Sequence, residues 1–194
     1  MASPITHPVV PVVAALLVGR AVVSVPLLIL GISFSILPDL DIIAFRLGVP
    51  YGSPYGHRGF SHSIVAALLL SMAAVPLARA LKAKPIVVFW FLSLSMLSHG
   101  ILDALTRNAT NGVALFWPFS TERILFSFRP IQASPISVQR FMSDRGLQVL
   151  WSEMVWVWAP LLVIGLVGLL VRRRMRANKQ LQLTRETRAT EQRR

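Results

Sequence analysis

The chain has 194 residues, of which 54% are hydrophobic and only 14% are charged, and its mean hydropathy is +0.61. Soluble domains carry about 25% charged residues, so the composition excludes an ordinary soluble domain and indicates an integral membrane protein. There is no cysteine. This excludes a disulfide framework and a zinc–thiolate site, so any metal must be bound by His, Asp or Glu side chains.

The net charge of +12 is concentrated near the C-terminus. Residues 172–194 contain nine Lys/Arg and two acidic residues, a net charge of +7, and begin with Arg172-Arg173-Arg174 directly after an apolar run. Such a run favours a cytoplasmic end in contact with anionic lipids over a nucleic-acid-binding segment. We therefore expect a membrane-embedded domain over residues 1–171 and a basic, disordered cytoplasmic tail over residues 172–194.

Five apolar segments predict an all-α membrane protein with about four or five membrane helices, over residues 8–19, 21–37, 62–78, 85–105 and 152–171. The first segment reaches only about 18 Å, short of a bilayer core of about 30 Å, so the first two segments form either a tight helix pair or one re-entrant hairpin. Glycines and prolines mark residues 42–56 as a loop. Residues 106–150 are mixed and polar, and residues 1–7 lack the positive charge of a cleavable signal peptide.

The polar ends of these segments sort by charge. If successive helices alternate in direction, the basic residues collect at one end of the bundle, and all four histidines collect at the other end with Asp39, Asp41, Asp103 and Glu153. Short basic loops lie on the cytoplasmic side of a membrane. The polar end is then expected to face the periplasm or exterior, although five arginines in residues 106–150 weaken this assignment of orientation.

His99 and Asp103 are four residues apart on a predicted helix. They therefore share one face, which is the spacing by which a helix offers two ligands to one metal ion. The alternative is a polar pair that faces the interior of a bundle. We favour ligands, because ionisable groups inside membrane segments are rare and are usually functional.

The run His57-Arg58-Gly59-Phe60-Ser61-His62 predicts a polar loop that leads into a helix with Ser61 as its N-cap. His57 and His62 would lie about 140° apart on an ideal helix, so a turn at Gly59 is needed to bring them together. The alternative is an interfacial loop with polar anchors.

The full set of candidate metal ligands is His7, Asp39, Asp41, His57, His62, His99 and Asp103. Asp39 and Asp41 could both reach a cation, or one of them could cap a helix or face water; His7 is included only for its position at the polar end. Seven such ligands suit Zn²⁺, Mn²⁺ or Fe²⁺ and exceed what one tetrahedral ion uses. Two ions are therefore expected, an arrangement typical of phosphoester hydrolysis.

The same residues resemble a known family of inner-membrane proteins, the YdjM-like family, described as LexA-binding metal-dependent hydrolases. The resemblance covers about residues 5–120 and rests on Leu37-Pro38-Asp39-Leu40-Asp41, His57 to Ser63, Ser98-His99, Asp103, Thr106, Gly112 and Trp117-Pro118. The family's early histidine matches His7. Its His-x-x-x-Asp spacing is similar to that of zinc-dependent phospholipase C and S1/P1-type nucleases, which implies phosphoester chemistry at an all-helical, multi-metal site. Residues 121–194 show no such match.

Together these observations predict a membrane-bound hydrolase that uses metal-activated water on a lipid or lipid-linked phosphoester. Arg58 could bind phosphate oxygens or extend to lipid headgroups, and Glu153 could be a ligand, a general base or an interfacial residue. One rival is a transporter whose His and Asp side chains relay ions or protons, but such a relay should extend through the bilayer. A second is a regulatory protein that acts through its basic tail. The substrate, the metal and the oligomeric state stay open.

Overall fold

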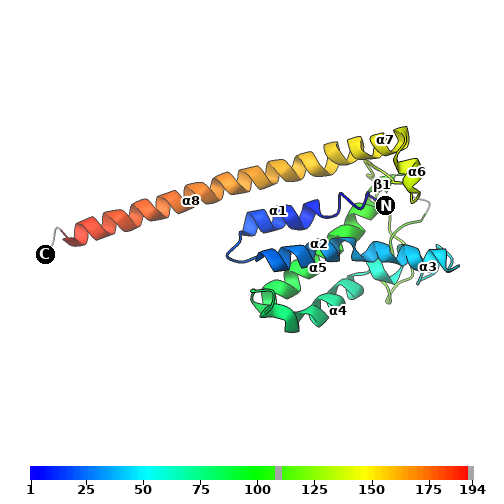
Figure 1. Ribbon diagram of the computed structural model, residues 1–194, viewed down its shortest axis with the longest axis horizontal. Coiled ribbons are helices and arrows are strands. Elements are labelled where there is room, and N and C mark those ends of the chain that lie inside the picture. Colours follow the sequence, from blue (N-terminus) through cyan, green and yellow to red (C-terminus); the bar gives the residue numbers. More distant parts are fainter. Residues whose placement is uncertain (108–110, 192–194) are drawn as a thin grey trace.

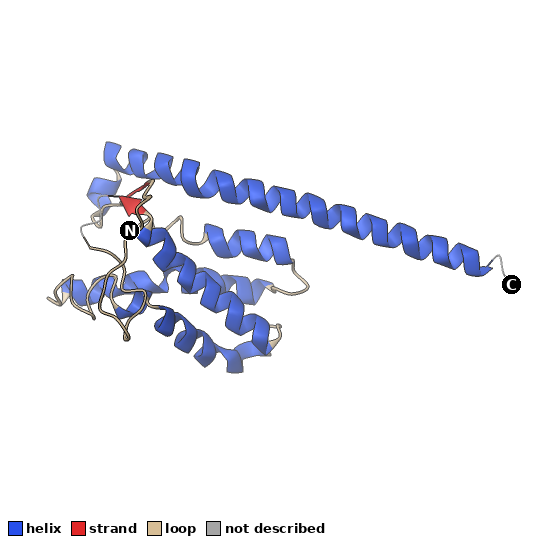
Figure 2. Ribbon diagram, turned by 180° about the vertical axis from the view of Figure 1, so that it is seen from behind, coloured by secondary structure: helices blue, strands red, loops and turns tan. Residues whose placement is uncertain are grey.

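The computed structural model describes residues 1–107 and 111–191, and almost all of its regular structure is helical. The helices are α1 (Val9–Val18), α2 (Val25–Ile36), α3 (Ile42–Arg46), α4 (Ile64–Ala74), α5 (Pro85–Ala104), α6 (Val138–Phe141), α7 (Asp144–Glu153) and α8 (Ala159–Glu191). Two short strands, β1 (Thr106–Arg107) and β2 (Ile131–Gln132), form a parallel pair near the N-terminus (Figure 2). The expected all-α fold is confirmed.

Helix α5 forms the centre of the bundle, with α2 and α4 packed against it, while α1 lies between α2 and α8 (Figure 1). The largest apolar core joins α1, α2, the end of α4 and α5 through side chains such as Leu27, Val88 and Leu92. Helices α2 and α5 approach closely at Gly31, where an added Cβ would lie 2.4 Å from the Phe91 ring. A larger side chain there would force the two helices apart.

The helices alternate in direction, as the sequence predicts. The end of α1, the start of α2, the end of α4 and the start of α5 lie together, on the left in Figure 1, so Arg20, Arg79 and Lys84 share this basic end. Arg172 of α8 also lies there and donates hydrogen bonds to the carbonyls of Leu16 (2.8 Å) and Leu17 (3.0 Å). A cation at these carbonyls stabilises the C-terminus of α1.

Three helical stretches are long and apolar enough to cross a membrane: Val25–Ala44, Pro85–Ala104 and Asp144–Gln180. Two further apolar helices, Val9–Val18 and Ile64–Ala78, are shorter. At 1.5 Å per residue, α1 is only about 15 Å long. Helices α1 and α2 are therefore separate antiparallel helices joined by a turn, and α1 cannot span a bilayer by itself.

Several predicted boundaries were wrong. Ser63, and not Ser61, is the N-cap of α4, because its hydroxyl accepts from the Ala66 amide. Residues 42–56 begin with the short helix α3, and the polar stretch 106–150 contains β1, β2, α6 and the start of α7. α7 is amphipathic with an N-cap at Ser143, so its mixed polarity resembled a loop in the sequence.

The last apolar helix is longer than predicted at both ends. It begins with α7, passes through one π-helical turn over Met154–Trp158, and continues as α8 to Glu191. The π turn ends two residues before Pro160, which lacks the amide hydrogen that an α-helix needs and crowds the carbonyl of Trp156, four residues earlier and within the turn.

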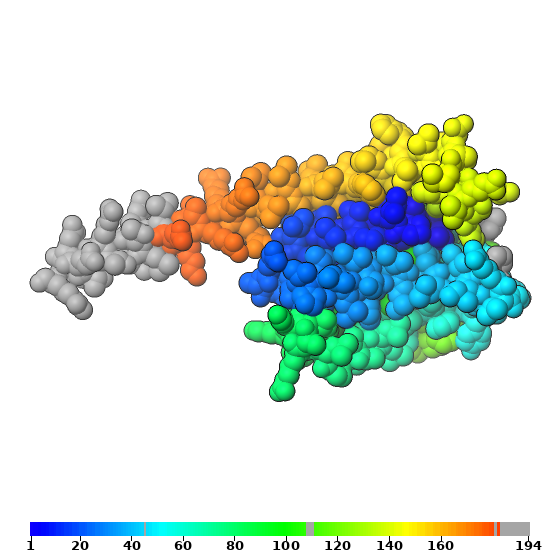
Figure 3. Space-filling view, viewed as in Figure 1, coloured from blue at the N-terminus to red at the C-terminus, as the bar shows by residue number. Residues whose placement is uncertain are grey.

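The tail was predicted to be disordered, whereas the structure continues as helix to Glu191, and residues 192–194 lie outside the described residues. Arg, Gln, Leu, Ala and Glu favour helix even where nothing packs against them, which explains the difference. Figure 3 shows the first part of α8 lying along α1, and the ribbon of α8 continues past the body of the protein (Figure 1).

Topology can be tested by reporter fusions after Val171 and near Gly112. The basic end holds Arg20, Arg79 and Lys84, so we expect a cytoplasmic reporter signal after Val171 and the opposite signal at Gly112. Matching signals at the two positions would contradict this topology.

Candidate metal centre

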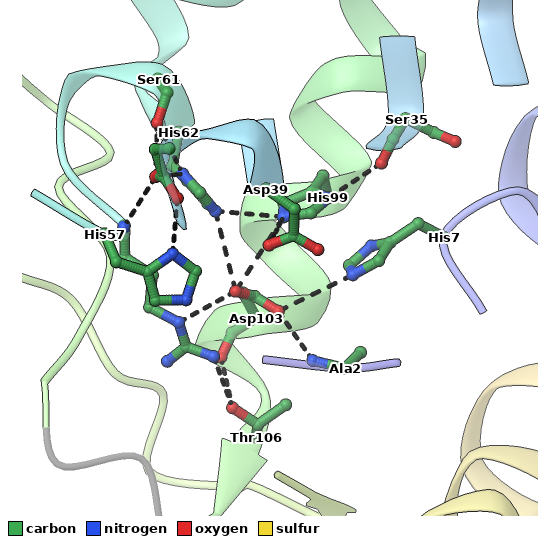
Figure 4. Close-up of polar contacts among 12 residues, drawn as sticks. Ala2, His7, Ser35, Asp39, His57, Ser61, His62, His99, Asp103 and Thr106 are labelled. Atoms are coloured by element: carbon green, nitrogen blue, oxygen red, sulfur yellow. Dashed lines mark hydrogen bonds and ion pairs between the residues drawn. The ribbon is translucent and has the colours of Figure 1, made fainter. Parts of the chain in front are cut away.

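Four side chains from three segments point toward one another at the polar end of the bundle (Figure 4). They are Asp39 in the 3₁₀ turn Leu37–Asp41, His62 in the 3₁₀ turn Phe60–His62, and His99 and Asp103 on α5. One ligand atom from each lies within 4.8 Å of all the others, and all four residues are buried. The predicted convergence of these residues is therefore present in the structure.

The hydrogen bonds of His99 define which of its nitrogens faces the centre. Its Nδ1 lies 2.8 Å from the backbone carbonyl of Ser35, which can only accept, so Nδ1 carries the hydrogen. In the neutral ring the lone pair is then on Nε2. That atom lies 3.4 Å from an Asp39 oxygen and 4.0 Å from an Asp103 oxygen.

His62 is oriented in the same way through Asp41. Ser61 donates to Asp41 Oδ2 at 2.7 Å, so its oxygen is available to accept from His62 Nδ1 at 3.0 Å, and Asp41 Oδ2 itself lies 3.2 Å from that nitrogen. The hydrogen is therefore on Nδ1, and the lone pair of Nε2 faces the centre. Metal-binding histidines are usually held in this way, with the other ring nitrogen donating to a carboxylate or a carbonyl.

This centre has the properties of a cation site. The Nε2 atoms of His62 and His99 lie 3.0 Å apart with lone pairs facing each other, an arrangement that repels unless a proton or a cation lies nearby. Both oxygens of Asp39 and Oδ2 of Asp103 are buried and have no hydrogen-bond partner among the described residues. A tetrahedral zinc ion places its ligands about 3.3 Å apart; four of the six spacings here run from 3.0 to 4.0 Å, and all six are within 4.8 Å. The residues therefore fit a divalent metal.

His7 lies beside this group. Its ring stacks on that of His99 with the centroids 3.7 Å apart, and its Nε2 is 3.9 Å from Asp103 Oδ1. Burial, reinforced by the nearby His99, lowers the pKa of His7 to about 3, so the ring is neutral at physiological pH. Asp103 thus presents one oxygen to His62 and His99 and the other to His7, an arrangement that could bridge two ions.

Asp41 and His57 lie in an outer layer. His57 Nδ1 is 2.5 Å from Asp41 Oδ1, while Asp41 Oδ2 faces His62, so Asp41 stands between the two histidine rings. Of the seven predicted ligands, the structure therefore gathers four, places His7 next to them, and gives Asp41 and His57 positions from which they orient His62.

Arg58 is fully buried against the same group. Its Nε lies 2.9 Å from Asp103 Oδ2, and its terminal nitrogens donate to Thr106 Oγ1 and the Asn111 carbonyl, both at 3.2 Å. The backbone of Arg58 has φ +63°, a conformation that non-glycine residues rarely adopt and that is often found at functional sites. This conformation lets the Arg58 amide donate to Asp41 while its side chain reaches Asp103.

Arg123 was predicted only as one of several loop arginines, but it holds the His57 loop in place. Its guanidinium donates to the carbonyls of His57 (3.1 Å), Gly112 (3.2 Å), Tyr51 (3.3 Å) and Ser53 (2.8 Å). No spacing in the sequence links an arginine to carbonyls 66 to 72 residues away. The one signal in the sequence was that these loops have no regular secondary structure, so their buried carbonyls need donors from elsewhere in the chain.

Glu153 belongs to a neighbouring cluster. Its carboxylate accepts from the Ser3 amide, from the Ser3 hydroxyl at 2.6 Å and from the Thr6 hydroxyl at 2.8 Å. The adjacent Ala2 amide donates to Asp103 Oδ1 at 2.8 Å. The N-terminal segment thus lies between Glu153 and the ligand group, so the position of Glu153 favours an anchoring role over the predicted ligand or general base.

The comparisons with known proteins agree with this picture. Residues 1–177 match the family described as YdjM inner membrane protein. The chain belongs to this family. It is also similar to the inner membrane protein YbcI of Escherichia coli (strain K12), with 38% identity over 169 residues that cover 86% of this chain and 97% of YbcI. No solved structure matches the chain. As a YdjM family member with three candidate membrane helices, it is an inner membrane protein.

Metal content tests the centre. We expect the purified protein to contain at least one equivalent of Zn, Mn or Fe, and we expect His99→Ala to lose most of it, because the substitution removes one of the two imidazole ligands and leaves a void in the buried site. Chelation should lower the melting temperature, since the carboxylates of Asp39 and Asp103 then repel each other. His57→Ala removes the same side chain from the outer layer, where it acts on His62 only through Asp41, and should lower metal content less than His99→Ala does. Absence of metal, with a melt unaffected by chelation, would contradict a metal centre.

The anchoring role of Glu153 is tested by Glu153→Gln. The amide loses charge-assisted hydrogen bonds to the N-terminal segment, and we expect the melting temperature in detergent to fall by roughly 4–10 °C with the metal content unchanged. Glu122→Gln, an exposed loop glutamate, is the matched control and should melt like the wild type. Loss of metal at an unchanged melting temperature would instead make Glu153 a ligand.

Proposed function

We propose that this protein is a membrane-bound, metal-dependent hydrolase that acts on a phosphoester of a lipid or of a lipid-linked molecule. The observation that carries the proposal is the group of four buried ligand atoms with Arg58 beside it. A divalent ion held by Asp39, His62, His99 and Asp103 would supply Lewis acidity, which activates water and polarises a phosphoryl oxygen. Zinc suits the mixed His/Asp ligand set, and manganese or iron would also fit it.

The protein's own groups would orient the reaction. Asp41 and the Ser35 carbonyl fix the two histidine rings with their lone pairs inward, so little reorganisation is needed when a cation binds. Arg58 neutralises part of the charge on Asp103. Among the contacts between described residues, each of its terminal nitrogens makes one hydrogen bond, which leaves one N–H on each for an anionic substrate.

The position of the site supports an amphiphilic substrate. The ligand group lies at the polar end of helices that are otherwise apolar, and the main apolar core of the bundle fills the space toward the basic end. A proton or ion relay would need polar groups through the depth of the membrane. The distribution of polar side chains therefore favours hydrolysis at one face over transport.

The reaction is tested by phosphate or headgroup release from detergent-purified protein loaded with Zn²⁺ or Mn²⁺. Asp103→Ala should abolish turnover while membrane insertion is retained, because Asp103 contacts His7, Arg58 and both inner histidines. Arg58→Lys should keep the metal and lower turnover by about 10²-fold, because an ammonium cannot replace a planar, bidentate donor.

Arg107→Lys, an exposed arginine next to Thr106, is the matched control and should be as active as the wild type. If metal-loaded protein hydrolyses no phospholipid, nucleotide or generic phosphodiester, yet exchanges ions in liposomes, the transport function would replace this proposal.

A further inference from the structure

An apolar groove of about 310 Å³ lies between α1 and α5. The walls come from one stripe of α1 and one of α5, and a single residue from the α1–α2 turn joins them: Val10, Pro11, Ala14, Val18, Val23, Ile86, Val87, Trp90, Phe91, Leu94 and Ser95. Ser95 is the one hydroxyl among them, and the lining carries no charge. The groove therefore suits a hydrocarbon ligand and not a polar one.

The groove opens onto the lipid-facing surface. Its rim side chains are half exposed, with Val18 at 49%, Trp90 at 51% and Leu94 at 60%, whereas Pro11 and Phe91 on its floor are buried. α5 is one of the three stretches able to span a membrane. The groove is thus continuous with the bilayer interface of the protein, and hydrocarbon can enter it from the side.

One end of the groove meets the metal centre. His7, in the turn that leads into α1, lies three and four residues before Val10 and Pro11, and on α5 His99 follows Ser95 by four residues and so continues the lining stripe of that helix. The two rings stack with their centroids 3.7 Å apart, and the ribbons of α1 and α5 diverge toward the basic end (Figure 2). The stacked pair thus links the end of the groove to the ligand group, of which His99 is a member.

We propose that this groove binds one hydrocarbon chain of an amphiphilic substrate whose phosphoester headgroup lies at the metal centre. That the headgroup is hydrolysed at the metal centre rests on the proposed function. That the chain lies in the groove rests on the opening of the groove to the bilayer and on its end near His7 and His99. From Val10 to Val18 the groove follows about 12 Å of helix, so it holds a chain that points away from the site toward the basic end.

A second groove provides a contrast within the same protein. It lies on the other side of α1, is lined by residues such as Val12, Leu16 and Leu28, and reaches Arg20 at the basic end. No ligand of the metal centre lines either groove, but only the first has lining residues, Val10, Pro11 and Ser95, within four positions of His7 or His99 in the sequence. A lipid chain there would belong to a headgroup at the opposite face. The α1/α5 groove instead ends one helical turn from His7 and His99.

The test uses phosphatidylglycerol with a diazirine at one defined carbon of an acyl chain, added in near-stoichiometric amount to the full-length, delipidated protein in detergent. A diazirine near the headgroup should label peptides around Val10 and Ser95, and one at the chain terminus should label those around Val18 and Ile86. This direction of labelling is expected only if the headgroup lies at the metal centre. Reversed or uniform labelling along α1 and α5 would overturn the proposal.

Ala14→Trp fills the groove and should reduce this labelling by at least about tenfold, because each methylene excluded from an apolar site weakens binding severalfold. Ala73→Trp makes the same change on the lipid-exposed face of α4 and should label like the wild type. Equal labelling of both variants would overturn the proposal. The proposal would also be overturned if two copies of the protein cross-link through their α1/α5 grooves and this contact excludes the lipid, because a second copy would then occupy the groove.

The same experiment separates the groove from the proposed hydrolysis. Directional labelling that Ala14→Trp abolishes, in metal-loaded protein that hydrolyses nothing, would establish a lipid-binding groove and remove the enzyme assignment. Hydrolysis of a short-chain phosphodiester without directional labelling would support the enzyme and remove the groove from its mechanism.

Discussion

The structure depends on the placement of negatively charged groups inside an otherwise apolar helical bundle. Asp39, Asp41, Asp103 and Glu153 all lie at one end, buried or nearly so. Carboxylates in such surroundings need hydrogen bonds or cations, because burial without a partner costs several kcal/mol or more. Glu153 has three donors from the N-terminal segment and Asp41 has donors from His57, Ser61 and Arg58. Among the described residues, neither oxygen of Asp39 accepts a hydrogen bond, and Oδ2 of Asp103 has the ion pair with Arg58 but no hydrogen bond, and this imbalance defines the centre.

The irregular segments around the centre serve this same requirement. The 3₁₀ turn at Leu37–Asp41 turns two aspartates two residues apart in different directions, one toward His99 and one toward His57 and His62. Arg58 adopts a strained backbone conformation so that a single residue supplies an amide to one carboxylate and a guanidinium to another. Arg123 holds the loop that carries His57 and Arg58 by donating to the His57 carbonyl. The regular helices set the depth of the site, and these turns set its orientation.

The sequence was sufficient to predict that the His and Asp side chains gather at one end of the bundle. It was not sufficient to predict which of them are inner ligands and which lie in the outer layer. The His99–Asp103 spacing and the alternating charge of the helix ends follow from helical periodicity, so they could be inferred without coordinates. The division between Asp39 as an inner group and Asp41 as an outer one depends on the backbone of a 3₁₀ turn, which spacing alone does not specify. Glu153 and Arg123 act on partners more than 60 residues away, and residues 1–6 carry no periodic pattern. Their roles arise only from tertiary packing.

The short length of α1 affects the bilayer around the protein. On α5, His99 lies fourteen residues from Pro85, so the ligand group is about 21 Å from the basic end, well inside a hydrocarbon core of about 30 Å. α1 is about 15 Å long, so its polar end at Val9 lies still closer to the basic end than His99 does. Hydrophobic mismatch of this kind thins the adjacent leaflet at a modest cost per ångström. The protein would therefore draw headgroups and water downward beside α1, forming a local depression in the membrane whose lowest point is the histidine stack.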